Sequence, residues 1–345
     1  MAIKNLFFLL LGLSLAPCLY ANNTVSVIGV GDIMLGTNFP NESYLPPNNG
    51  KGLLQEVNHI LRQADVTFGN LEGVVLNQGG EVKKCQDPTK CYAFRMPESL
   101  VSNLKLASFD VLNLANNHSN DFGSIGMKNT IAALSKFKIA SAGLLIKPTA
   151  VFKRNGVRYG LAGFAPNKGT IGFHNIKTVK KIVSRLAKKV DIVIVSFHGG
   201  AEGAKHQHIT RKTETFYGEN RGNVYKFAHA VIDAGADVVF GHGPHVVRAV
   251  ELYKNRFIAY SLGNFCTYGR FNLSGLAGIA PIIKVKMTKS GEFVNAQIIA
   301  AKQHGLGGSK LDKNNRAIKK IQNLTKTDFP KTNLHIADNG LITKK

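Results

Sequence analysis

The sequence contains no tryptophan, and acidic residues are scarce beside basic ones. Its 345 residues include 44 Lys and Arg against 21 Asp and Glu, which gives a formal net charge of +23 at pH 7. Because the basic residues are spread along the chain, we expect a broad positive field that suits nucleic acid, an anionic polymer or an anionic membrane surface. No zinc-finger, glycine-arginine or aromatic RNA-binding motif accompanies this charge, so we expect no nucleic-acid partner.

Long hydrophobic runs are also missing. The N-terminal apolar stretch, residues 6–15, is too short to span a membrane comfortably. Lys4 precedes it and small residues follow at 16–21, which is the layout of a secretory signal. We therefore predict a signal peptide over residues 1–21 and an exported protein, periplasmic, in the cell envelope or extracellular. Lipoprotein processing at Cys18 and an uncleaved membrane anchor stay open as alternatives.

Cysteine is rare, with four residues in the chain. Cys85 and Cys91 flank a polar loop, and in an oxidising compartment such a pair would close a small disulfide ring. In a reducing compartment they would be two free thiols. Cys266 follows an apolar strand, so we expect a small buried hydrophobe and not a nucleophile.

The chain lacks internal repeats and any linker long enough to separate two domains. Predicted strands alternate with amphipathic helices, and a hairpin with an Asn155-Gly156 turn and two later hairpins join them. This pattern indicates an α/β fold of two mixed sheets packed face to face with helices outside. One domain is predicted over residues 24–305, followed by a polar, basic tail over residues 306–345 that forms one surface helix and then frays. The predicted helices span residues 52–64, 97–106, 125–137, 179–189 and 223–234.

Polar residues follow five of the predicted strands at the point where each strand ends. Open α/β sheets bind ligands at that edge, so one shared site is the economical interpretation. Any one of these residues could instead cap a turn or make a structural hydrogen bond. The residues are Asp32, Glu72, Asn117 with His118, His198, and His242 with His245.

These side chains offer carboxylate, carboxamide and imidazole groups, which together suit one or two divalent ions such as Mn, Zn, Fe or Mg. Such an ion supports hydrolysis of phosphate esters or amides. His118 is expected to point away from the metal and to act as a general acid, with Asp121 fixing its tautomer. The candidate metal ligands are Asp32, Glu72, Asn117, His198, His242 and His245.

Seven motifs of this sequence resemble, in order, those of one known family, the CapA/PgsA-type poly-γ-glutamate capsule biosynthesis proteins, which have a calcineurin-like metallophosphoesterase fold. The resemblance covers most of residues 25–265. The motifs are Gly31-Asp32-Ile33-Met34-Leu35-Gly36, Asn70-Leu71-Glu72, Phe94-Arg95-Met96-Pro97-Glu98, Asn116-Asn117-His118-Ser119-Asn120-Asp121-Phe122-Gly123, His198-Gly199-Gly200-Ala201-Glu202, Gly241-His242-Gly243-Pro244-His245-Val246 and Tyr260-Ser261-Leu262-Gly263-Asn264-Phe265.

The resemblance implies a four-layer α/β/β/α sandwich with a metal site, and poly-γ-glutamate or a related anionic envelope polymer as substrate. Membrane-bound capsule synthesis or export subunits are the implied protein partners. Arg95, Glu202 and Asn264 are implied as substrate-binding residues that line the site. Arg95 could alternatively steady the loop between Cys85 and Cys91, and Asn264 could only shape the turn after its strand.

The sequence departs from the phosphoesterase pattern at several ligand positions. Met34 stands where that pattern has a histidine, and Glu72 stands where an aspartate normally bridges two metals. The last histidine is displaced by one position, at His245, and Gly199 replaces a frequent tryptophan. Two functions are therefore open: a metal-dependent hydrolase, or a non-enzymatic polymer-binding or export subunit with a degenerate site.

Overall fold

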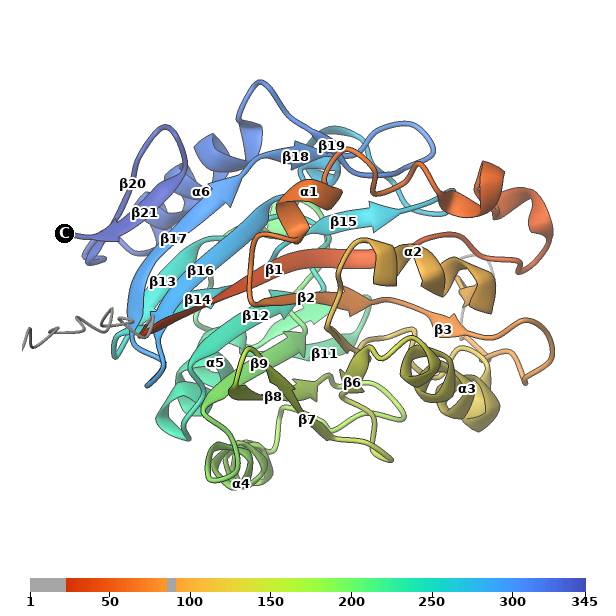
Figure 1. Cartoon of the computed structure of the whole chain (residues 1–345), viewed down its shortest axis with the longest axis horizontal. Coiled ribbons are helices and arrows are strands. Elements are labelled where there is room, and N and C mark those ends of the chain that lie inside the picture. Colours follow the sequence, from red (N-terminus) through yellow and green to blue (C-terminus); the bar gives the residue numbers. More distant parts are fainter. Residues whose placement is uncertain (1–22, 86–90) are drawn as a thin grey trace, which may run out of the picture.

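Runs of apolar residues form the strands of two mixed sheets in the computed structural model, which describes residues 23–85 and 91–345 (Figure 1). The strands of the larger sheet are β1 (Thr24–Met34), β2 (Val66–Leu71), β5 (Val111–Asn113), β6 (Ala140–Ala142), β15 (Asn264–Thr267), β16 (Ile282–Thr288), β17 (Phe293–Ile299), β20 (Leu334–Ile336) and β21 (Leu341–Lys344). This nine-stranded sheet has the order β20-β21-β17-β16-β1-β2-β5-β6, and β15 also pairs with β1.

The second sheet has six strands in the order β13-β14-β12-β9-β8-β7. They are β7 (Thr149–Arg154), β8 (Val157–Phe164), β9 (Ile192–His198), β12 (Val238–His242), β13 (Val250–Tyr253) and β14 (Arg256–Ala259). Two-stranded pieces complete the strands: β3 (Val74–Val75) with β4 (Arg95–Met96), β10 (Glu214–Phe216) with β11 (Glu219–Gly222), and β18 (Ala301–Lys302) with β19 (Lys310–Leu311).

Neighbouring strands at the centre of both sheets run parallel. In the larger sheet β1, β2, β5 and β6 are parallel, and in the smaller sheet β8, β9, β12 and β14 are parallel. Within each sheet the carboxyl ends of these strands therefore meet at one edge, where α/β proteins hold their ligands.

The two sheets pack face to face through large apolar side chains. Phe68 of β2 stacks on Phe240 of β12, with ring centroids 5.3 Å apart. Gly29 of β1 leaves room for that ring, because a Cβ at this position would collide with Phe240. The core between the sheets is therefore closed by aromatic packing that a side chain at residue 29 would disrupt.

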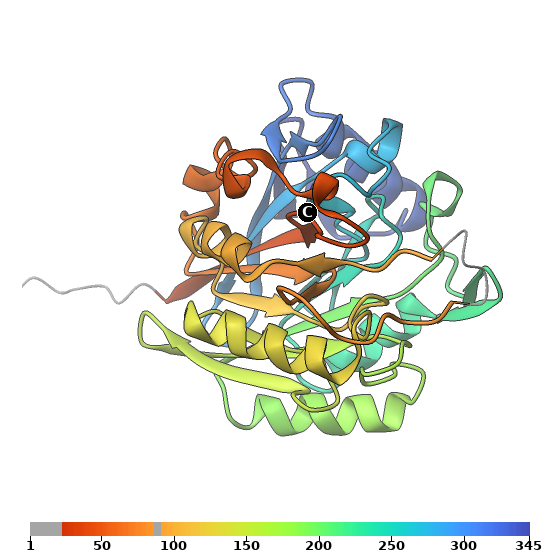
Figure 2. The ribbon, with the colours of Figure 1, turned by 90° about the vertical axis from the view of Figure 1, so that its right-hand side faces the viewer.

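Helices cover the outer faces of both sheets. Residues of α1 (Asn58–Leu61), α2 (Val101–Leu106) and α3 (Gly123–Lys136) pack in the core of the larger sheet's outer face, whereas α4 (Ile176–Ala187) and α5 (Val224–Asp233) pack on the smaller sheet. Figures 1 and 2 both show α4 lying along the outer side of the smaller sheet. The predicted α/β/β/α arrangement is thus confirmed.

The predicted hairpin turn and the predicted disulfide are both present. Asn155-Gly156 joins β7 to β8, with positive φ angles of 47° and 82°. A disulfide joins Cys85 to Cys91, as predicted. Cys266 is buried, and burial raises the pKa of its thiol to about 12, so it is inert as predicted.

The predicted signal peptide at residues 1–21, including Cys18, lies outside the described residues. Among residues 23–85 and 91–345, no helix combines the length and the apolar character needed to cross a membrane.

The prediction of one helix over residues 52–64 is wrong in its extent. Only Asn58–Leu61 is α-helical, and tight turns precede it, with Leu53 donating to the Gly50 carbonyl and Val57 to that of Leu54. In these turns the amide of residue i+3 donates to the carbonyl of residue i, which winds the chain more tightly than an α-helix. The apolar residues that produced the prediction are buried all the same.

The tail at residues 306–345 forms the predicted helix, α6 (Arg316–Asp328), but the residues after it do not fray. There β21 pairs with β17 and with β20, which is the edge strand. Apolar residues are few in this segment, but Ile318, Ile321 and Leu324 lie on one helix face and are buried. The polar composition concealed this face.

We predict that Ile321→Ala lowers the free energy of unfolding by about 2 to 4 kcal/mol, because the side chain is 1% exposed and its loss leaves a cavity. The control is Lys319→Ala on the exposed side of α6, which should change stability by less than about 0.5 kcal/mol. Urea unfolding of the full chain measures both. Equal stability of the two variants would contradict the docking of α6.

Candidate metal centre

Three buried side chains meet where strands of both sheets end. Asp32 lies on β1, Glu72 follows β2, and His198 is the last residue of β9. One ligand atom from each lies within 4.8 Å of the other two, and all three residues are 0% exposed. The structure therefore brings together two carboxylates and an imidazole that are 40 or more positions apart along the chain.

Several atoms of this group and of the adjacent His242 have no hydrogen-bond partner within the described part of the chain. They are both carboxylate oxygens of Glu72, both ring nitrogens of His198 and Nε2 of His242. A buried polar atom without a partner costs about 1 to 3 kcal/mol. Because carboxylate oxygen and imidazole nitrogen are ligands for divalent cations, these residues fit a metal ion, and a bound ion would satisfy the unpaired atoms.

The pKa shifts of Glu72 and His198 also fit a bound cation. Burial, with the nearby charge of Asp32, raises the pKa of Glu72 well above its ordinary value. Burial, with the positive charge of Arg221, holds the pKa of His198 well below its ordinary value. The neutral imidazole is the form that binds metals, and a cation would favour ionised Glu72.

Asp32 is held by hydrogen bonds from both sheets. Its Oδ1 accepts from Asn70 Nδ2 at 2.8 Å and lies 3.2 Å from His242 Nδ1, while Oδ2 lies 3.0 Å from His245 Nδ1. Burial alone would raise the pKa of Asp32, but the two histidine contacts outweigh it and lower that pKa. Asp32 is therefore an ionised carboxylate at the centre of the site.

His245 serves as a counter-ion in this arrangement. Its Nδ1 also lies 3.1 Å from Asn264 Oδ1, and its Nε2 lies 3.5 Å from Glu72 Oε1. Burial opposes its protonation, but Glu72, followed by Asp32 and Glu202, raises the pKa of His245 to about 10. Its predicted role as a metal ligand stays a prediction, as does that of His242.

His118 and Asp121 form the expected pair beside this group. His118 Nδ1 lies 2.7 Å from Asp121 Oδ2, which leaves Nε2 3.9 Å from Glu72 Oε1. Burial lowers the pKa of His118, although Asp121 acts against that shift. Phe94 stacks on the imidazole, with ring centroids 4.2 Å apart. The ring is thus held between a carboxylate and an aromatic face.

Lys83 was missed by the sequence analysis. It comes from the polar loop before Cys85, and its Nζ lies 2.6 Å from Asp121 Oδ1 and 3.4 Å from His118 Nδ1. Nothing in the loop's sequence distinguishes Lys83 from the neighbouring lysine.

The predicted role of Asn117 as a metal ligand stays a prediction. Its side-chain oxygen is buried without a partner in the described residues, and no contact with Asp32 or Glu72 is described. Asn116 instead donates to Asn70 Oδ1 at 3.2 Å and to the Leu71 carbonyl at 2.8 Å. Asn113 donates to the same Asn70 oxygen at 2.8 Å.

This asparagine network orients the amide that binds Asp32, and the sequence analysis assigned no role to Asn70 or Asn113. The position of Asn70, two residues before the predicted ligand Glu72, was the sequence signal that could have identified it.

The three residues expected to line the site have different surroundings. Arg95 donates from Nε to Asn38 Oδ1 at 2.7 Å and from Nη1 to the Gly79 carbonyl at 3.0 Å, and neither partner belongs to the loop between Cys85 and Cys91. Glu202 pairs with Arg221 at 3.0 Å, and its charge reaches His245. Asn264 is 1% exposed and contacts His245. Their contact with a substrate stays a prediction.

Comparisons with known proteins give the family. Residues 26–268 match the family model of the bacterial capsule synthesis protein PGA_cap. The chain is 32% identical over 263 residues to the PGA biosynthesis protein CapA of Bacillus subtilis (strain 168), which covers 71% of this chain and 64% of that protein. It is 29% identical over 263 residues to the capsule biosynthesis protein CapA of Bacillus anthracis, covering 71% of this chain and 60% of that protein. The chain therefore spans less than two thirds of the length of these relatives.

Among solved structures, the calcineurin-like phosphoesterase YfkN from Bacillus subtilis is similar, with a TM-score of 0.43 and 13% identity over 88% of this chain and 97% of that chain. The family model covers well over half of this sequence and includes every residue of the candidate centre. The chain belongs to the bacterial capsule synthesis protein family.

Proposed function

We propose that this chain is an exported, metal-dependent hydrolase that acts on poly-γ-glutamate or a related anionic envelope polymer. The observation that carries the proposal is the buried group of Asp32, Glu72 and His198. The Glu72 oxygens and His198 nitrogens have no hydrogen-bond partner in the described residues, and the group lies beside the His118–Asp121 pair. The names of the Bacillus relatives, which refer to PGA and capsule biosynthesis, support the polymer. The net charge of +23 suits a polyanionic substrate.

A divalent ion at this group would lower the pKa of a bound water and stabilise a developing oxyanion. Asp32, Glu72 and His198 would hold the ion, and neutral His198 has its lone pair available. Asp121 fixes the His118 ring through Nδ1, so the opposite nitrogen faces the centre. That nitrogen is placed to donate a proton to a leaving group, and a lowered pKa makes the protonated ring a stronger acid.

A second function has its own observation. Met34 is 1% exposed at the position where the phosphoesterase pattern has a histidine, and its sulfur accepts from the Gly36 amide at 3.3 Å. Met34 thus fills its site with a soft sulfur that hard cations disfavour. This supports a polymer-binding or export subunit without turnover, which would work with membrane-bound capsule synthesis subunits.

Metal binding gives the first test. We predict that the purified full chain binds Mn, Zn, Fe or Mg, and that a metal concentration one hundred times Kd raises the free energy of unfolding by about 2.7 kcal/mol. His198→Ala should lose the metal, because the ring nitrogens of His198 have no other partner described. His208→Ala is the matched control, since that imidazole pairs with Asp328 at the surface. Elemental analysis and thermal melts measure both, and full metal content in His198→Ala would contradict the site.

Turnover gives the second test. His118→Ala should keep its metal and lose roughly two to four orders of magnitude in hydrolysis of γ-glutamyl polymer, the usual contribution of a general acid. A generic phosphodiester tested in parallel identifies the type of bond that is cleaved. Polymer binding by the wild type with no turnover under any of these metals would favour the second function.

Export gives the third test. We predict that the mature chain begins after Ala21 and that the Cys85–Cys91 disulfide forms in the exported protein, where oxidation lowers the mass of that peptide by two hydrogen atoms. Cell fractionation and non-reducing peptide mapping measure these. Lipid on Cys18 or a retained N-terminus would identify the two alternative anchors, and an intact chain in the cytoplasm would refute export.

A further inference from the structure

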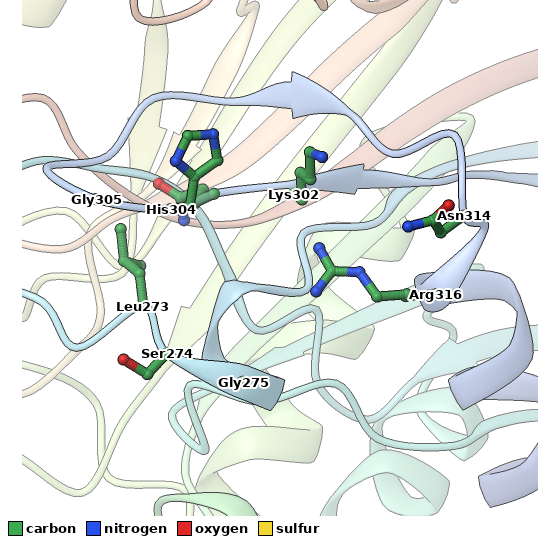
Figure 3. A pocket seen from close by; sticks show the side chains of 9 residues that line it. Leu273, Ser274, Gly275, Lys302, His304, Gly305, Asn314 and Arg316 are labelled. Atoms are coloured by element: carbon green, nitrogen blue, oxygen red, sulfur yellow. The ribbon is translucent and has the colours of Figure 1, made fainter.

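A hollow of about 610 Å³ lies between the loop after β15 and the segment that joins β18 to α6 (Figure 3). Of the residues described as lining it, none is Asp or Glu, and most of the polar ones can donate hydrogen bonds. These include Ser274, Lys302, Gln303, His304, Asn314 and Arg316. The lining therefore suits an anion.

Two cationic side chains of the hollow are available to a ligand. Arg316 pairs through Nε with Asp312 Oδ2 at 2.7 Å, and no partner of its two Nη groups is described. In Figure 3 the Arg316 guanidinium reaches from the start of α6 into the hollow, below Lys302. No ion pair of Lys302 appears in the described part of the chain either. The fixed geometry of a guanidinium matches the two oxygens of a carboxylate.

Gln303 ties the wall of the hollow to β15. Its side chain is buried at 2% exposure, and its Oε1 accepts from the Thr267 amide at 2.7 Å. This contact fixes the segment that carries Lys302 and His304 against the end of that strand.

The hollow and the metal centre flank the same short strand. Asn264, the first residue of β15, contacts His245 of the centre, and Thr267, the last, holds Gln303 of the hollow. Four residues of strand span roughly 10 Å at about 3.3 Å per residue. Asn264 also donates to the Ala277 carbonyl, in the turn Gly275–Gly278 that begins in the hollow's lining. The hollow and the centre are therefore connected through β15 and the turn that follows it.

We propose that this hollow is a carboxylate-binding subsite that holds one repeat of an acidic polymer. Every γ-linked glutamyl repeat carries a free carboxylate, so successive repeats present the group that Arg316 and Lys302 recognise. The choice of polymer rests on the proposed function, whereas the choice of carboxylate rests on the lining of the hollow.

Isothermal titration of the full chain tests the subsite with two probes, a γ-linked glutamyl oligomer and free glutamate. Arg316→Gln should weaken oligomer binding about tenfold, the loss of one charge-assisted contact, and Lys302→Gln should weaken it several-fold. Arg185→Gln is the matched control, because it removes the same charge from the exposed face of α4 and should leave affinity unchanged. Lys302→Gln breaks no described ion pair, so it tests the subsite even if Arg316→Gln loses stability with its Asp312 contact.

Unchanged oligomer binding in both hollow variants would overturn the subsite, and so would an equal loss in Arg185→Gln. Free glutamate binding as tightly as the oligomer would overturn the polymer assignment. His198→Ala separates the two proposals, because it should remove turnover and leave oligomer affinity dependent on Arg316. If the wild type shows no turnover but Arg316-dependent binding persists, the hydrolase fails and the subsite stands.

Discussion

Burial of two carboxylates side by side is the constraint on which the rest of the site depends. Contacts with Asn70, His242 and His245 keep the buried Asp32 carboxylate ionised. Glu72 has no such bonds among the described residues, and burial raises its pKa. Only positive charge can hold both groups ionised in this environment. His245 supplies one cation, and a divalent ion beside His198 would supply the other.

The sheets bring these charges together because both contribute strand ends to one edge. Asp32 and Glu72 come from the nine-stranded sheet, and His198 and His242 come from the six-stranded sheet, where they are direct neighbours in register. The two halves of the site therefore keep their geometry only while the sheets stay docked. Phe68 and Phe240 close that interface beside Gly29, so aromatic packing below the site fixes the distance between its carboxylates and its imidazoles.

The sequence predicted the two sheets and the buried Asp32, Glu72 and His198 group because buried strands leave apolar runs, and a polar residue at the end of such a run stands out. It did not predict the Lys83 contact with Asp121, since loop residues reach the site through a path that no local pattern encodes. Asn113 was given no role for another reason: it is a polar residue inside a strand, and its purpose shows only once Asn70 is placed opposite it. The helix expected in the basic tail is present as α6, but the ordered strands after it were not predicted, because apolar residues are few in that segment.

The charge of the surface and the charge of the centre have opposite signs, and this sets a condition on any polyanion that binds. A net charge of +23 would attract an anionic polymer from a distance, but salt screens that attraction beyond about 8 Å. Near the centre, ionised Asp32 and Glu202 would repel a polyanion, and Glu72 would add to that repulsion once a cation ionised it. Protonated His245 and a bound cation would reverse the local sign, so an anionic group could approach the centre only with those positive charges in place.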